Sequence, residues 1–418
     1  MVFPSNESAE TTPFGASFIQ TFRALRHRNF RYYWIGLSIS LIGTWMQTVA
    51  LSWLAYDLTA SPFMLGLINV VALVPVVPVS LFAGVISDRF SRKTLSMIAS
   101  LILALQALAL ALLTWFKVID IWQVMILSFI LGAAGALEQP ARMAMVSDMV
   151  GKEDLANAVA LNASIFNLAR IIGPSIAGLL VAWTGEAGCF AVNAAARLAV
   201  VVTLFFVRVP FQPKVKEKRG TRAGLMGGFR YVWNTKAIRS LMTIVAVTSF
   251  FSMSYVMLAT VFASDILKTG PAGVGFLMTA VGIGAIVGAL LVASLREGKR
   301  GRWLMWGNLI GSAFLIAFCF SRTLPIALAL ILAVGISNAI RQNLSNSLLQ
   351  IITPEDLQGR VMSIFNIFFN SMSRLGNMAV GGVADFTGVA WAVGLGGAAS
   401  LIWSIIALWQ MPEVRRLA

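Results

Sequence analysis

The stretch GVISDRFSRK at residues 84–93 decides the fold, because it is a short polar link between two long apolar runs. Residues 63–86 and residues 94–116 contain no charged side chain, and each run is long enough to cross a bilayer as a helix. So short a link can only turn the chain back on itself. The sequence therefore predicts an antiparallel pair of membrane helices at this point.

The charged part of this link is basic. Asp88 stands among three cations, Arg89, Arg92 and Lys93, and Gly84 lets two helices approach closely. Basic links of this kind lie on the cytoplasmic side of a membrane. The pattern G-x-x-x-D-R-x-x-R-K between two spans resembles the signature loop of the major facilitator superfamily, between its second and third membrane helices. The resemblance implies that these five residues form a gating loop.

Composition places the whole chain in the membrane class. Of 418 residues, 58% are hydrophobic and 12% are charged, and the mean hydropathy is +0.82. Soluble proteins have about 25% charged residues, so we expect an all-α integral membrane protein. The net charge of +15 lies in short links between spans, where it sets orientation and meets anionic lipid head groups. Nucleic-acid binding is therefore not expected.

The apolar runs predict twelve membrane helices in two six-helix bundles. Ser61 and Pro62 are expected to start the second span, and Pro75 and Pro78 to kink it. The predicted spans are residues 32–56, 63–86, 94–116, 121–142, 156–183, 187–208, 241–263, 272–294, 303–321, 325–351, 358–384 and 390–411.

The spans define five predicted parts of the chain. These are a tail at 1–22, a first bundle at 23–208, a cytoplasmic linker at 209–240, a second bundle at 241–411 and a tail at 412–418. Of the basic residues in links, only Lys117, Lys268 and Arg322 fall on the outer side, so both termini are expected in the cytoplasm.

The two halves repeat one another. Glu153-Asp154-Leu155 precedes a long helix that ends at Thr184-Gly185, and Glu355-Asp356-Leu357 precedes one that ends at Thr387-Gly388. Gly173 and Gly178 in the first helix correspond to Gly376 and Gly381 in the second. Such repeats are typical of transporters whose substrate site lies near the bilayer midplane.

A narrower resemblance rests on the region from the fourth to the fifth span. The runs at 140–142, 154–158 and 169–178 look like the enterobactin-exporter-like branch of the superfamily, which also holds macrolide efflux proteins. Gly173, Pro174 and Gly178 are similar to the fifth-helix packing motif of drug/proton antiporters. The resemblance implies export of a siderophore or drug-like molecule from the cytoplasm of a bacterium, across its inner membrane.

Ionisable residues inside the membrane are functional candidates, because burying their charge is costly. Glu138 is the one carboxylate placed well inside a span. It is a candidate proton-coupling group, and the alternative is a structural partner of Arg142, one helical turn further on.

Four further arginines, together with Gln47, are candidates for substrate binding, because guanidinium groups bind carboxylates and phosphates well. The alternative is bonding to backbone carbonyls or to Asn167, Asn338 or Asn370. These arginines are Arg170, Arg197, Arg341 and Arg374.

The predicted function is secondary transport by a monomer that exports a small amphipathic or anionic compound against a proton gradient. The sequence has one histidine, two separated cysteines and no phosphate-binding loop, so neither a cofactor nor a metal site is expected. The alternatives are a metabolite uptake carrier of the same fold, a non-transporting receptor or a membrane enzyme. An enzyme would need a catalytic cluster, which the sequence does not offer.

The resemblance also implies a latch between the halves. The aspartate that matches Asp88 packs near the start of the eleventh helix in this superfamily, where the helix dipole favours negative charge. Thr353 is expected to cap that helix and Pro354 to be its first residue.

Overall fold

The computed structural model describes residues 22–76, 78–80, 91–207, 221–295, 298 and 300–417. Of the predicted gating loop, Gly84, Asp88 and Arg89 lie outside these residues. Arg92 and Lys93 lie inside them. The described elements are η1 (Arg23–Arg26), α2 (Arg28–Thr59), α3 (Pro62–Leu73), α5 (Arg92–Trp115), α6 (Ile121–Phe206), α7 (Thr221–Asn234), α8 (Lys236–Ser252), α9 (Tyr255–Val261), η2 (Phe262–Ile266), α10 (Gly270–Ala293), α11 (Arg300–Cys319), α12 (Leu324–Ile352), α13 (Glu355–Thr387), α14 (Val389–Gln410) and α15 (Pro412–Arg415).

Within the described residues every regular element is helical, which confirms the all-α class. Nine helical stretches of the described chain are long and apolar enough to cross a membrane. One of them, α6, is interrupted at Gly151 and Gly185, where φ is 72° and 71°. Such positive φ values suit glycine. They divide α6 into segments at 121–150, 152–184 and 186–206. The count of twelve spans remains a prediction.

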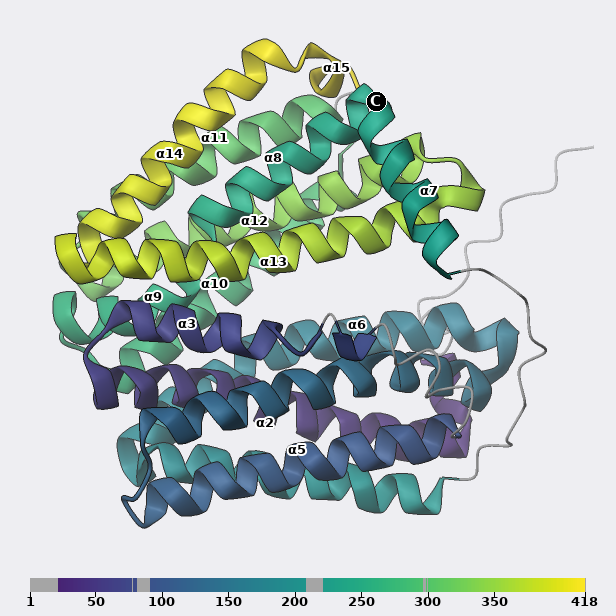
Figure 1. The fold of residues 1–418 in the computed structure, drawn as a ribbon, viewed down its shortest axis with the longest axis vertical. Coiled ribbons are helices and arrows are strands. Elements are labelled where there is room, and N and C mark those ends of the chain that lie inside the picture. The colour runs from purple at the N-terminus through teal and green to yellow at the C-terminus, as the bar shows by residue number, and fades with distance from the viewer. Residues whose placement is uncertain are drawn as a thin grey trace, which may run out of the picture.

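The helices form two bundles, one for each half of the chain (Figure 1). The purple and blue helices of the first half lie below the green and yellow helices of the second half. Gly388, at the end of α13, has φ of 86° and so repeats the backbone turn at Gly185. The predicted internal repeat therefore extends to backbone conformation.

Helices α7 and α15 and the C-terminus lie at one end of the molecule, here called the linker side. The other end, where α2 turns into α3, is called the opposite side. Helix α7 packs on α13 and α8, and α8 begins at Lys236, within the predicted linker.

Repeated glycines bring the helices close together. A Cβ at Gly173 would lie 2.5 Å from the Trp45 side chain of α2, and one at Gly376 would lie 1.9 Å from the Phe250 carbonyl oxygen of α8. Only glycine tolerates such approaches. The 152–184 segment of α6 thus packs on α2 as α13 packs on α8.

A second glycine pair lies where the two halves meet. Gly178 faces α10, with a would-be Cβ 2.8 Å from the carbonyl oxygen of Pro271. Gly381 faces α3, with a would-be Cβ 2.5 Å from the carbonyl oxygen of Pro62. The halves therefore meet along two helix pairs, α6 with α10 and α13 with α3. Pro174 is buried in the first of these contacts, where its carbonyl oxygen faces Gly275.

Helix ends agree with most of the sequence expectations. Ser61 caps α3 by accepting a hydrogen bond from the Met64 backbone, and Pro62 is the first residue. Helix α3 ends at Leu73, shortly before Pro75. The expectation for Thr353 is wrong, because α13 begins at Glu355 and Thr353 has extended backbone after α12.

Candidate functional site

A buried ion pair lies inside the first bundle. Arg197 Nη1 donates to Glu138 Oε1 at 2.9 Å and to Oε2 at 3.0 Å, and each residue is 7% exposed. Ser100 donates to Glu138 Oε1 at 3.1 Å, and Arg197 Nη2 donates to Thr44 Oγ1 at 3.0 Å. The carboxylate of Glu138 is thus fully engaged by partners from α5 and from the last segment of α6.

This arrangement corrects the predicted pairing of Glu138 with Arg142. Among the described residues, Arg142 makes no salt bridge with Glu138, and its side chain is half-buried. Four residues separate the two along the helix, but Arg197 reaches the carboxylate across the bundle. The pairing is therefore a contact between helix segments rather than a local one.

A chain of buried amides adjoins this pair. Asn193 Nδ2 donates to Gln47 Oε1 at 2.5 Å, and Gln47 Nε2 donates to Gln106 Oε1 at 3.2 Å. These three side chains come from three different helices and are each 3% exposed. These two hydrogen bonds fix the orientation of the Gln47 amide, because its oxygen accepts from Asn193 and its nitrogen donates to Gln106.

The pair and the amides border a cavity of about 230 Å³. Arg197 and Gln47 line it from the first half, and Arg374 lines it from α13 of the second half. Its wall mixes hydroxyl and amide groups with apolar side chains. The remaining lining residues are Thr44, Thr48, Leu51, Ser52, Ala55, Leu65, Ile68, Asn69, Ala72, Leu103, Gln106, Ser128, Leu131 and Asn193.

Three of the predicted arginines, Arg170, Arg341 and Arg374, form no salt bridge within the described residues, whereas Arg197 does. Arg374 Nη1 donates to the Asn69 carbonyl oxygen at 3.5 Å, across the contact between halves. Arg170 has a buried Nε with no hydrogen-bond partner in the described part of the chain. Arg374 therefore lines the cavity as a charge that no described side chain neutralises.

Arg341 lies elsewhere, in the second bundle. It lines a separate, smaller cavity with residues of α8, α9, α11, α12 and α14. Its Nη2 bonds to Asn338 Oδ1, one helical turn earlier. The structure therefore brings together Gln47, Arg197 and Arg374, and it separates Arg341 from them.

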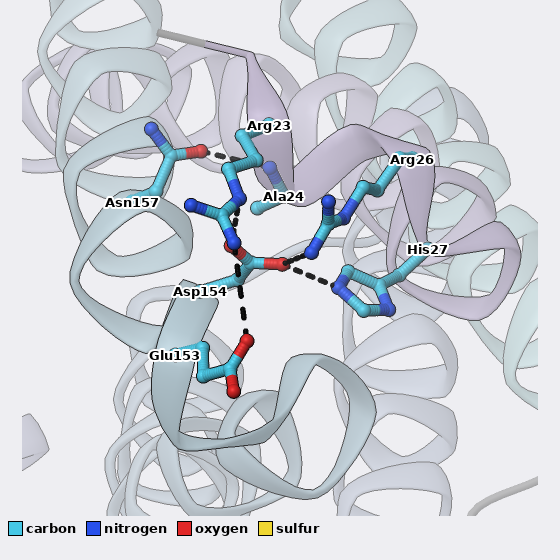
Figure 2. A network of polar contacts seen from close by, with 7 residues as sticks. All are labelled: Arg23, Ala24, Arg26, His27, Glu153, Asp154 and Asn157. Atoms are coloured by element: carbon cyan, nitrogen blue, oxygen red, sulfur yellow. Dashed lines mark hydrogen bonds and ion pairs between the residues drawn. The ribbon is translucent and has the colours of Figure 1, made fainter. Parts of the chain in front are cut away.

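A polar network ties the first residues of the bundle to α6 on the linker side (Figure 2). Asp154 is 2% exposed and binds Arg23 Nε at 2.8 Å, Arg26 Nη2 at 2.9 Å and His27 Nε2 at 2.7 Å. The His27 hydrogen bond, with the charges of Arg23 and Arg26, holds the pKa of Asp154 below its usual range. This network anchors η1 to the start of the 152–184 segment.

The two remaining residues of the gating loop bind within the first half. Arg92 Nη1 pairs with Asp148 Oδ1 at 2.5 Å, and Lys93 Nζ donates to the Val207 carbonyl oxygen at 2.7 Å. Both contacts lie on the linker side.

On the opposite side, hydrogen bonds join the two halves. Tyr56 donates to Asp265 Oδ2 at 2.6 Å, and Ser61 donates to Asp385 Oδ2 at 2.9 Å. The Phe63 backbone N–H also points at Asp385 Oδ1, at 3.5 Å. Asp385, at the end of α13, thus meets the N-terminus of α3, where the helix dipole favours a negative charge.

Comparison with known proteins places this geometry in a family. The family described as transmembrane secretion effector matches residues 19–417. The chain belongs to this family of the major facilitator superfamily. It is therefore a multi-pass membrane transporter.

Similar transporters are exporters by name. The multidrug efflux pump Tap of Mycolicibacterium fortuitum is 27% identical over 83% of this chain and 87% of its own length. The enterobactin exporter EntS of Shigella flexneri is 25% identical over 93% of each chain. Among solved structures, the nucleoside transporter NupG superposes with a TM-score of 0.74 at 13% identity, covering 92% of this chain and 99% of its own.

Sequence reasoning missed several polar residues of the transporter's first bundle. Ser100, Gln106 and Asn193 are uncharged polar residues within apolar helices, and single residues of this kind carry little signal. Their periodic position on one helix face with other buried residues is the signal that identifies them.

Proposed function

We propose that the transporter exports a small amphipathic or anionic compound, driven by a proton gradient. The observation that carries the proposal is the buried Glu138–Arg197 pair at the edge of a mixed polar and apolar cavity. The exporter names of the two relatives support the direction of transport.

Glu138 is the proposed proton-binding group. Protonation removes its charge, so the attraction that joins the first and last segments of α6 weakens. Arg197 is then free to turn toward the cavity that it lines. A proton can bias a transporter between two conformations when its affinity differs between them.

Arg374 is the proposed contact for an acidic group of the substrate, and Gln47 for a polar group. Both line the cavity, and apolar residues such as Leu51, Leu65 and Leu103 suit a hydrophobic body. Arg170 lies on the 152–184 segment of α6, next to Ile171, which packs on Gly282 of α10. A change at that contact would bring Arg170 to the substrate.

The placement of contacts between the halves supports transport by alternating access. Among described residues, the side-chain hydrogen bonds that join the halves lie at mid-depth or on the opposite side. If the linker side faces the cytoplasm, this arrangement corresponds to a state closed toward the outside. Export then requires these contacts to break.

The test is transport in proteoliposomes with an imposed pH gradient, with a fluorescent anionic dye as the probe. We expect Glu138→Gln to lose gradient-driven accumulation while it retains dye exchange between the two sides. Glu153→Gln is the matched control, because its side chain is 87% exposed. Gradient-driven accumulation by Glu138→Gln would place the coupling group elsewhere.

A further inference from the structure

The second bundle buries a cation that no carboxylate neutralises. Arg341 is 5% exposed, and within the described residues it forms no salt bridge. A guanidinium group stays protonated in proteins, so its charge cannot be removed by losing a proton. An uncompensated charge buried inside a membrane protein is strongly unfavourable.

The internal repeat shows how the second bundle differs from the first at the position of Arg341. Glu138 and Arg341 are equally far from the first residues of the helices that hold them, Ile121 and Leu324. The position that carries a carboxylate in the first half therefore carries a cation in the second half.

The three other residues of the Glu138 cluster have counterparts as well. Each counterpart is equally far from the first residue of its helix, or from the positive-φ glycine before it. The corresponding pairs are Thr44 and Ser252, Ser100 and Asn308, and Arg197 and Ser400.

Both sets of four residues cluster in space. The first set is joined by the hydrogen bonds around Glu138. The second set, with Arg341, lines the smaller cavity. The first cluster contains one carboxylate and one guanidinium group and is neutral. The second contains one guanidinium group and three uncharged side chains, so it lacks one negative charge.

The smaller cavity supplies hydrogen-bond donors to a negative group. Asn308 is 6% exposed, and its Nδ2 has no hydrogen-bond partner among the described residues. Ser252, Ser400 and Tyr255 place hydroxyl groups on the same wall. Buried donors that lack partners are costly, and an anion would satisfy them together with Arg341.

We propose that this cavity binds one small inorganic anion of about the size of chloride. Its volume of about 30 Å³ suits one or two water-sized species and excludes a drug-like molecule. The bound anion supplies the negative charge that the Glu138 carboxylate supplies in the first half. It is thus a structural counter-ion of the second bundle and is distinct from the transported compound.

The test uses the purified full-length transporter and radioactive chloride. We expect one chloride bound per chain, and a thermal midpoint that rises by a few degrees when chloride replaces gluconate at constant ionic strength. Arg341→Gln should weaken chloride binding at least tenfold. Arg374→Gln, which removes an equal charge from the larger cavity, should still bind one chloride.

A second variant tests the site without removing its cation. Asn308→Asp introduces a carboxylate beside Arg341, as Glu138 does beside Arg197, and should make the thermal midpoint independent of chloride. It should also be more stable than the wild type in gluconate. The proposal is wrong if the wild type binds no chloride, if Arg374→Gln loses chloride as Arg341→Gln does, or if Asn308→Asp responds to chloride like the wild type.

Discussion

The partner of Glu138 shows what sequence reasoning finds at the scale of single residues and what it misses. The sequence identified Glu138 and Arg197 as buried ionisable residues, because charge is rare in apolar spans. It paired Glu138 with Arg142, since residues three or four apart are the neighbours that a helix alone specifies. The contact with Arg197 depends on how segments of α6 pack, and a single sequence does not encode that in a readable pattern.

The stability of the Glu138–Arg197 pair can be measured with a double-mutant cycle. Arg197→Gln leaves Glu138 buried without its cation and should cost about 3–5 kcal/mol. The double variant Glu138→Gln, Arg197→Gln should recover a large part of that loss, because no buried charge remains. The measurement is unfolding of the purified transporter by denaturant. A double variant as unstable as the sum of the single variants would show that the two residues do not interact.

Asp154 predicts a dependence of stability on pH. Its pKa is lowered in the folded state by the His27 hydrogen bond and the two arginines, so its ionised form stabilises the fold. This stabilisation is complete above the ordinary aspartate pKa of 3.8 and is lost as the pH falls through the lower folded value. Asp154→Asn should therefore lower the thermal midpoint by a few degrees at pH 7.

The difference between wild type and Asp154→Asn should shrink below about pH 3.8. Glu153→Gln should behave like the wild type, since Glu153 is exposed and 3.9 Å from Arg23. A difference that stays constant down to pH 2 would assign the effect of Asp154→Asn to packing rather than charge.

At the scale of elements, α3 and α13 form the clearest contact between the halves. The sequence predicted both helices from apolar runs, turn residues and prolines, and Ser61 was predicted as the cap of α3. It did not predict that Asp385 would bind the same helix end from the other half. A helix cap supplied by a distant segment leaves no local pattern.

Removing the Asp385 charge should weaken closure on the opposite side. Asp385→Asn loses the charge–dipole attraction to the α3 N-terminus, which is worth about 0.3–1 kcal/mol at an exposed site, or about a two- to fivefold shift in the conformational equilibrium. A cysteine at Asn69, in a background without Cys189 and Cys319, should react faster with an impermeant thiol reagent added outside. Asp120→Asn, at a turn within the first half, is the control and should leave the rate unchanged.

At the scale of the whole molecule, the sequence predicted the class, the repeat and the family correctly. Long apolar runs, basic links and repeated glycines are each strong signals, because the bilayer allows a chain only a few kinds of membrane-spanning structure. The repeat also separates the two bundles chemically, since Glu138 and Arg341 occupy matching positions with opposite charges. The roles of individual polar residues could be predicted less well from the sequence, because they arise from contacts between helices far apart in the chain.

The transporter is expected to balance two latches on one helix pair. Asp385 at the end of α13 meets the start of α3 on the opposite side. The resemblance to the superfamily implies the reverse on the linker side, with Asp88 near the start of α13 at Glu355 in the other conformation. Each latch would then stabilise one of the two states.

Asp88→Asn should therefore keep expression but slow transport, because the state closed on the linker side loses its latch. Asp385→Asn should shift the equilibrium the other way. If both latches act on one equilibrium, the double variant Asp88→Asn, Asp385→Asn should transport dye faster than Asp88→Asn alone. Initial rates in proteoliposomes, at equal protein amounts, measure this. If Asp88→Asn transports dye at the wild-type rate, the proposed linker-side latch does not exist. If the double variant is slower than either single variant, the two aspartates act on different steps.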